Sequence, residues 1–278
     1  MRWLLAVQAQ DPGAWPLALR ARGSGFGRSD AVGARELVRG WLMRGTLHVV
    51  CGEDWWWLHA LTARRGVERD AASDAVVAVL EDEGPLERHP LIERLAARGL
   101  VLEGQAFPHL LARCCALGDV VMAGERFVLA RDWVGTPPRP VDRDAALREL
   151  GVRYARAHPG AGVEDLAAWS GLGLRAARTA LAGVAPAAPL EEEDGPLGPR
   201  LLPALDPLLL GWRDRTPTVP DALARRVHPG GGMLRPVALD DGLVAGTWGM
   251  PRGEPAVDAP DPARFAAEAA DVRRFEAS

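Results

Sequence analysis

The stretch QAFPHLLARCCALGDVVMAGERFVLA, from Gln105 to Ala130, decides the fold. Its first part, 105–117, predicts a helix because apolar side chains recur at helical spacing. Two short apolar runs follow over 120–122 and 126–130, and the turn Ala123-Gly124-Glu125 separates them. A helix that leads directly into a short hairpin is typical of a winged helix-turn-helix, in which the hairpin is the wing.

Working outward, the sequence predicts further helical modules on both sides of this stretch. Asp11-Pro12 and Asp30 are helix-start signals, because aspartate caps free backbone N–H groups and proline fits the first helical turn. The predicted helices are 12–22, 30–40, 53–65, 73–82, 89–98, 143–157, 163–170 and 174–181, with a strand within 41–50. We therefore predict winged helices over residues 1–66, 67–135 and 136–189, the third with a Gly171-Leu172-Gly173 turn.

The remaining residues have a different character. After the acidic run Glu191–Asp194, strands are predicted over 200–205, 208–212, 233–239 and 243–248, with a hairpin turn at Asp241-Gly242. We predict a β-rich segment over 190–253 and a peripheral tail over 254–278 that ends in a helix from Pro262 to Phe275. The expected fold class is α+β, with tandem winged helix-turn-helix modules and a C-terminal β-rich region.

Composition excludes several classes of site and of enzyme. All 33 basic residues are arginine, so no lysine is present to form a Schiff base or to bind phosphates in a P-loop. The three cysteines, Cys51, Cys114 and Cys115, lack the spacing of a zinc site or a disulfide framework. We expect no metal and no cofactor. No apolar run is long enough for a membrane helix, so we expect a cytoplasmic protein. We also expect a monomer.

The charge is distributed unevenly along the chain. The net charge is −4, yet residues 1–66 carry nine arginines against five acidic residues, and residues 196–239 carry six against three. Residues 67–135 are acidic overall. Separate basic regions suit a protein that presents one charged face to DNA, although an ordinary solvated surface would look similar. Winged helices also serve as protein–protein modules, so the pattern favours DNA binding without deciding it.

Five blocks of the chain resemble the AlkZ/YcaQ-type winged-helix DNA glycosylases in order and spacing. They are VQAQDP (Val7–Pro12), WLMRGTLH (Trp41–His48), DLAAWSGL (Asp165–Leu172), PALDPLLLGWRDR (Pro203–Arg215) and PGGGMLRPV (Pro229–Val237). The resemblance implies three winged helices around a concave channel for duplex DNA. It also implies excision of alkylated purines, including the unhooking of bulky crosslinks. Members usually carry a further helical segment before the first block, so the first module is expected to be N-terminally incomplete.

The resemblance identifies Gln8 and Gln10 as the catalytic pair, in the Gln-x-Gln branch of the family rather than the Gln-x-Asp branch. An N7- or N3-alkylated purine is already cationic, so it leaves as a neutral base and needs little general-acid help. Two amide carbonyls could hold the attacking water and favour an oxocarbenium-like transition state. We therefore predict a monofunctional DNA glycosylase. Asp11 is an alternative general base, although its place before Pro12 favours helix capping.

The partner implied by the resemblance is double-stranded DNA with an alkylated purine, in the nucleoid. The expected DNA-binding residues are Arg44, His48, Arg225, Arg226, His228, Gly230 and Gly231. Arginine pairs with phosphate bidentately, and a glycine-rich loop can approach a groove closely. His48 could instead be a satisfied strand residue, and Arg225 and Arg226 a solvated helix end. The alternative function is a noncatalytic DNA-binding protein that confers genotoxin resistance or acts as a regulator.

Overall fold

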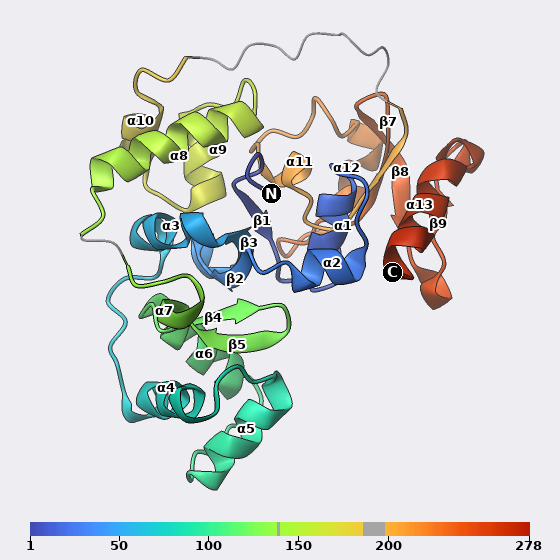
Figure 1. The fold of residues 1–278 in the computed structure, drawn as a ribbon. Coiled ribbons are helices and arrows are strands. Elements are labelled where there is room, and N and C mark those ends of the chain that lie inside the picture. Colours follow the sequence, from blue (N-terminus) through green and yellow to red (C-terminus); the bar gives the residue numbers. More distant parts are fainter. Residues whose placement is uncertain (138–139, 186–197) are drawn as a thin grey trace.

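The computed structural model describes residues 1–137, 140–185 and 198–278, in which two antiparallel sheets are surrounded by helices (Figure 1). The first sheet has the strand order β1-β3-β2-β4-β5, and the second has the order β6-β7-β8-β9. The fold is a mixture of helix and antiparallel sheet. The predicted acidic linker Glu191–Asp194 lies outside the described residues. Within them, no helix is both long and apolar enough to cross a membrane.

The stretch from Gln105 to Ala130 forms the predicted helix and hairpin. Helix α6 (Ala106–Ala116) is followed by β4 (Val120–Ala123) and β5 (Arg126–Leu129), which pair in antiparallel register. Gly124 makes the turn with φ +57°, a conformation that glycine adopts without a steric penalty. Helices α4 (Ala71–Glu83) and α5 (Arg88–Ala97) complete this unit at the lower end of the molecule. The predicted hairpin is confirmed.

The first module differs from the prediction in its second helix. Helix α2 spans Arg28–Gly33, and β2 (Leu37–Trp41) occupies residues that were expected to be helical. Asp30 does not begin the helix but lies in its first turn. There its carboxylate accepts a hydrogen bond from the backbone N–H of Gly27, the residue before the helix, at 2.8 Å. The predicted strand within 41–50 is also two pieces, the end of β2 and β3 (Leu47–Cys51), joined by a tight turn. Because Arg39 pairs with Met122, both hairpins share one sheet.

The third module is helical, and the bounds of its three helices are the predicted ones. Helices α8 (Arg143–Ala157), α9 (Val163–Ser170) and α10 (Leu174–Leu181) enclose a buried cluster, and Gly171 ends α9 in the left-handed conformation. Helices α8 and α10 cross closely at Gly151. A β-carbon added there would lie 1.8 Å from the carbonyl oxygen of Ala180, so this contact requires glycine.

Replacing Gly151 with alanine is therefore expected to lower stability. Alanine favours helix by about 1 kcal/mol over glycine, but the clash is with backbone and forces the helices apart, so we expect a net loss of about 1–3 kcal/mol. Chemical unfolding measures it. The matched control is Gly33→Ala at the end of α2, where the added methyl meets no neighbouring atom. Equal unfolding free energies for the two variants would contradict the close crossing.

The C-terminal region departs from the prediction at residues 208–212. These residues were expected to form a strand, whereas Pro207–Leu210 form the short helix α11. Asp206 caps this helix through the Leu208 N–H, and Pro207 occupies its first turn, the same Asp-Pro signal that was recognised at Asp11-Pro12. The second sheet contains β6 (Arg200–Leu202), β7 (Val237–Asp240), β8 (Leu243–Gly249) and β9 (Ala256–Asp258). Asp241-Gly242 makes the predicted hairpin turn between β7 and β8.

The last residues form an integral part of the fold, so the prediction of a peripheral tail was wrong. β9 extends the second sheet, and Phe265 immediately precedes α13 (Ala266–Glu276), whose Val272 and Phe275 are buried with Phe265. Arg20 at the end of α1 (Ala14–Arg20) is itself buried and is paired with Glu268 and Asp271 of this segment. Phe265 and Phe275, which stand in a sequence made mostly of alanine and charged residues, attach this segment to the rest of the fold.

Candidate active site

Gln8 and Gln10 lie at the end of the edge strand β1 (Ala6–Gln8). Gln8 is paired in register with His48 of β3, and the Ala9 N–H continues the ladder by donating to Leu47 at 2.8 Å. Residues two apart in an extended segment point to the same side. The two amides accordingly meet, with Gln8 Nε2 donating to Gln10 Oε1 at 2.8 Å. Gln8 is buried and Gln10 is exposed, so the pair opens to solvent at Gln10.

Arg44 determines which way the two amides face. Its Nη2 donates to Gln8 Oε1 at 3.0 Å, and because a guanidinium has no acceptor, the atom that it meets must be the oxygen. Gln8 Nε2 must then point away from Arg44, toward Gln10 Oε1. Each carbonyl oxygen accepts two hydrogen bonds, so each amide oxygen keeps one position for a further donor. A water molecule is a donor that fits both.

Arg44 is itself held in a tight turn. It lies in the turn Met43–Gly45 between β2 and β3 with φ +58°, a conformation that non-glycine residues rarely adopt. Its guanidinium also donates to the backbone oxygens of Ala168 and Trp169 at the C-terminal end of α9. These carbonyls carry the negative end of the helix dipole. The strained turn therefore brings a cation to α9 and to Gln8 together.

A second arginine, Arg215, adds positive charge near Arg44. Burial lowers the pKa of Arg44, and the positive charge of Arg215 lowers it further. Arg215 lies in the loop after α11, where its Nε donates to the Leu209 carbonyl. It stands in the quoted block 203–215, yet nothing in the local pattern distinguishes it from Arg213, which is exposed. The sequence prediction did not single out Arg215, whose charge acts on Arg44.

His48 is buried, so its side chain does not lie on the surface, as was expected of a DNA-binding residue. It is 2% exposed, and its Nδ1 donates to the Thr46 carbonyl at 2.9 Å. Burial lowers the pKa of His48 to about 4. It is a neutral, hydrogen-bonded residue of β3, beside Gln8 in the sheet. His158, stacked on Tyr154 at the end of α8, is buried in the same way, and burial lowers its pKa to about 4.

These two histidines predict acid sensitivity. Because their pKa values in the folded chain lie below the ordinary value of 6.5, the unfolded chain binds more protons as pH falls. Their contribution to stability is therefore complete above pH 6.5 and is lost between pH 6.5 and 4, at about 1.4 kcal/mol per pH unit for each histidine. Urea unfolding at pH 7 and pH 5 measures the loss.

A variant of an exposed histidine is the control for the two buried ones. His109 is exposed on α6, so His109→Gln should leave the difference between pH 7 and pH 5 unchanged. Stability that is equal at the two pH values would contradict the burial of neutral His48 and His158.

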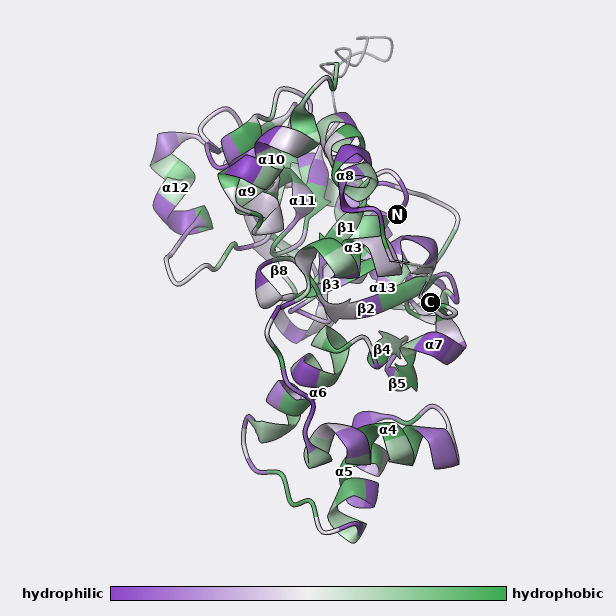
Figure 2. Ribbon diagram, turned by 90° about the vertical axis from the view of Figure 1, so that its left-hand side faces the viewer, coloured by the Kyte–Doolittle hydropathy of each residue, from purple (hydrophilic) through white to green (hydrophobic). Residues whose placement is uncertain are grey.

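The glycine loop and its arginines lie at the end of α12 (Asp221–Val227), which stands out from the body in Figure 2. Arg225 is exposed, as a DNA contact requires. Arg226 is instead half-buried, and it donates to Thr247 and pairs with Asp258. Gly230 bridges to Met233 and makes the exposed loop a tight hairpin, with positive φ at Gly230. The loop therefore presents backbone and Met233 to solvent.

Asp11 serves the helix that follows the glutamines. Its carboxylate accepts hydrogen bonds from the N–H groups of Gly13 at 2.8 Å and Ala14 at 3.2 Å. These are the free donors at the start of α1, so the capping alternative agrees with the geometry. The carboxylate is thereby turned toward the helix.

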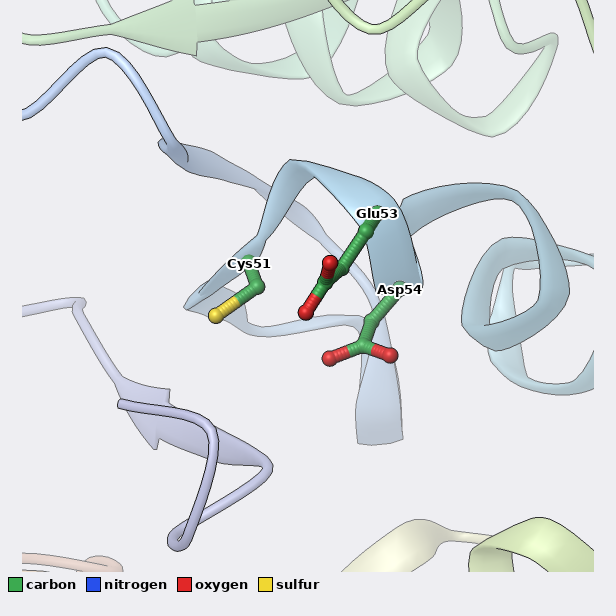
Figure 3. Close-up of side chains that lie close together, drawn as sticks. All are labelled: Cys51, Glu53 and Asp54. Atoms are coloured by element: carbon green, nitrogen blue, oxygen red, sulfur yellow. The ribbon is translucent and has the colours of Figure 1, made fainter.

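Figure 3 shows a second group of chemically capable side chains, Cys51, Glu53 and Asp54, whose ligand atoms lie within 4.8 Å of one another. The two carboxylates already have partners. Arg2 donates to Glu53 at 2.7 Å, while Arg153 and Trp57 both donate to Asp54. Burial raises the pKa of the Cys51 thiol, and Asp54 raises it further. Paired carboxylates and a protonated thiol suit a structural cluster better than a metal site.

Comparison with known proteins identifies the family and the fold. The family model described as DNA glycosylase AlkZ-like matches residues 1–275. The chain belongs to the AlkZ-like DNA glycosylase family. A solved structure, DNA glycosylase AlkZ from Streptomyces sahachiroi, superposes with a TM-score of 0.70 at 22% identity, over 98% of this chain and 89% of that chain. This likeness shows the shared fold. No curated protein matches the chain significantly in sequence.

Proposed function

We propose that this member of the family is a monofunctional DNA glycosylase that hydrolyses the glycosidic bond of alkylated purines, bulky or crosslinked adducts included. The observation that carries the proposal is the hydrogen-bonded order Arg44 to Gln8 to Gln10. It leaves two amide oxygens side by side, each with one free acceptor position.

The chemistry needs little more than this pair. Alkylation at N7 or N3 gives the purine a positive charge and weakens its bond to the sugar. Water then has to be delivered to the anomeric carbon, and the oxygens of Gln8 and Gln10 hold it there. Their dipoles also stabilise positive charge that develops on the sugar. The chain contains no lysine, so no lysine Schiff base with the abasic sugar forms, and the strand is left uncut.

DNA binding is assigned to the hairpins. We propose that the β2–β3 and β4–β5 hairpins are the wings of two winged helices, and that α8, α9 and α10 form a third helix-turn-helix around a channel for the duplex. The exposed Arg225 contacts phosphate, and the Gly230-Gly231 loop approaches a groove. Met233, 58% exposed beside it, is suited to wedge between bases.

Incubation with duplex DNA that contains N7-methylguanine tests the reaction. We expect release of the intact methylated base, an abasic site that remains uncut until alkali is added, and no covalent complex on addition of borohydride. Absence of base release, at a protein concentration that binds the duplex, would overturn the proposed hydrolysis. A borohydride-trapped complex would overturn the monofunctional assignment.

A further inference from the structure

The end of α9 lies directly against the turn that carries Arg44. Gly171 ends this helix in the left-handed conformation, and a β-carbon added to it would lie 3.1 Å from both the backbone nitrogen and the Cγ of Arg44. The guanidinium of Arg44 donates to the carbonyls of Ala168 and Trp169 in the last turn of the same helix. Backbone and side chain of Arg44 are therefore both in contact with the third module.

The side chain of Arg44 caps α9 from a distant part of the chain. The last carbonyls of a helix have no partner within it, and an arginine can bond them there and favour the helix dipole. The Nη1 of Arg44 takes this role, while its Nη2 donates to Gln8 Oε1 at 3.0 Å. A guanidinium is planar and its N–H groups have fixed directions. The orientation of the Gln8 amide is thus set from α9 through a rigid group.

The elements on both sides of Arg44 are held in place by buried residues. Leu42 and Met43, which precede Arg44 in the chain, are fully buried, and the Leu42 N–H donates to the Thr46 carbonyl across the turn at 3.1 Å. On the helix, Trp169 is buried with its ring centroid 5.2 Å from that of Tyr154 in α8. Arg44 therefore has a fixed position, although it is an exposed residue.

We propose that Arg44, held by the end of α9, is a positioning residue that fixes the Gln8 amide for delivery of water, and that it is not a phosphate ligand. This rests on the proposed function, in which the Gln8 oxygen holds the water. Three hydrogen bonds to protein oxygens occupy the guanidinium, and a phosphate would have to compete with them. An exact position matters because a displacement of about 1 Å can lower a rate by about 100-fold.

The side-chain amides report this positioning without DNA. The chain contains three glutamines, Gln8, Gln10 and Gln105, and no asparagine, so an amide proton–nitrogen spectrum holds three pairs of NH2 signals. Gln105 is exposed and serves as the reference for a free amide. We expect a high heteronuclear NOE for Gln8 in the parent that falls to the value of Gln105 in Arg44→Met. Arg213→Met removes the same charge from an exposed residue and should leave Gln8 unchanged. A Gln8 amide that stays ordered in Arg44→Met would overturn the proposal.

Single-turnover base release at saturating protein separates positioning from binding. Arg44→Met should lower the rate by about 100-fold, while its affinity for the duplex falls no further than that of Arg213→Met. A phosphate ligand would give the opposite result, with weaker binding, a smaller salt dependence and an unchanged rate at saturation. Because Arg44 acts through Gln8, adding Arg44→Met to Gln8→Ala should lower the residual rate by less than about 2-fold. Two losses that multiply would contradict positioning through Gln8.

Two glycines with the same backbone conformation test the contact with α9. Gly171 and Gly183, which follows α10, have φ of +75° and +73°, so alanine is strained at both. The added methyl meets Arg44 at Gly171, whereas at Gly183 no described atom lies within 4 Å of it. Gly171→Ala should lower the NOE of Gln8 and the rate of base release, the latter by about 10-fold, and Gly183→Ala should change neither. Equal effects of the two variants would show that α9 does not position Gln8.

The amide measurement requires neither substrate nor catalysis, so the two proposals can fail separately. Base release by the parent, together with a Gln8 amide that is indifferent to Arg44→Met, refutes only the positioning. No base release by the parent, together with a Gln8 amide that Arg44→Met sets free, refutes only the reaction.

Discussion

Gln8→Glu should lower the rate of base release by about 100-fold or more, whereas Gln10→Glu should retain the rate within about 10-fold. The direction of the hydrogen bonds is the reason. Gln8 must donate to Gln10 Oε1, and a carboxylate at position 8, kept ionised by Arg44, has no hydrogen to donate. Its oxygen would face the oxygen of Gln10 and repel it. At position 10 a carboxylate still accepts from Gln8 and still has an oxygen for water.

Single-turnover base release on N7-methylguanine duplex, with both variants at saturating protein, measures this asymmetry. Affinity for undamaged duplex serves as the control, because each variant adds the same negative charge and nonspecific binding should fall by a similar factor. Equal rates for the two variants, or a larger loss at position 10, would contradict the order Arg44 to Gln8 to Gln10.

Asp206→Ala is expected to lower the free energy of unfolding by about 3–5 kcal/mol. Asp206 is fully buried, accepts two hydrogen bonds from Arg22 at 2.8 and 2.5 Å, and caps α11 through Leu208. Its removal leaves Arg22 with only the Ala18 carbonyl as a partner among the described residues and the helix without a cap. Because Arg22 directly follows α1, the same pair ties the segment after the glutamines to the helix before Arg215.

Chemical unfolding compares this variant with Glu83→Ala. Glu83 accepts from Arg94 at 2.7 Å on the surface, and exposed pairs of this kind contribute about 1 kcal/mol or less. The double variant Asp206→Leu, Arg22→Met should recover part of the loss, because no unpaired charge remains. A loss for Asp206→Ala no larger than that for Glu83→Ala would show that the pair does not stabilise the fold.

The sequence was most informative where one local signal determined an element. The predicted bounds of helices α8, α9 and α10 agree with the structure, and the Gly171-Leu172-Gly173 turn separates the last two. The β4–β5 hairpin follows from its turn. The strand β2 was wrongly predicted as helix because Asp30 was taken as the start of a helix over 30–40. An aspartate in the first turn of a helix gives the same sequence signal as one at its start. The helix α11 was missed because three consecutive leucines suit a buried strand as well as a buried helix.

Part of the site could not be predicted because it depends on long-range contacts. The Gln8–Gln10 bond joins neighbours, so a motif could point to it. The bonds from Arg44 to Gln8 and to the carbonyls of α9 join residues far apart in the chain. The loop before Arg215 is likewise tied to α9 over a long sequence separation, by the bond from the Arg213 N–H to Asp165. His48 and Arg226 matched the expected residue type for DNA contact, yet His48 is buried and bonded to Thr46, and Arg226 is bonded to Thr247 and paired with Asp258.

The most direct measurement compares the parent with the double variant Gln8→Ala, Gln10→Ala in single-turnover release of N7-methylguanine, at protein concentrations that saturate the duplex for both. The amides lie at the end of an edge strand and open to solvent at Gln10, so duplex affinity should change little. We expect base release by the parent and a rate at least about 100-fold lower for the double variant. Equal rates, or no release by either protein while both bind, would contradict catalysis by the glutamine pair and favour a noncatalytic DNA-binding role.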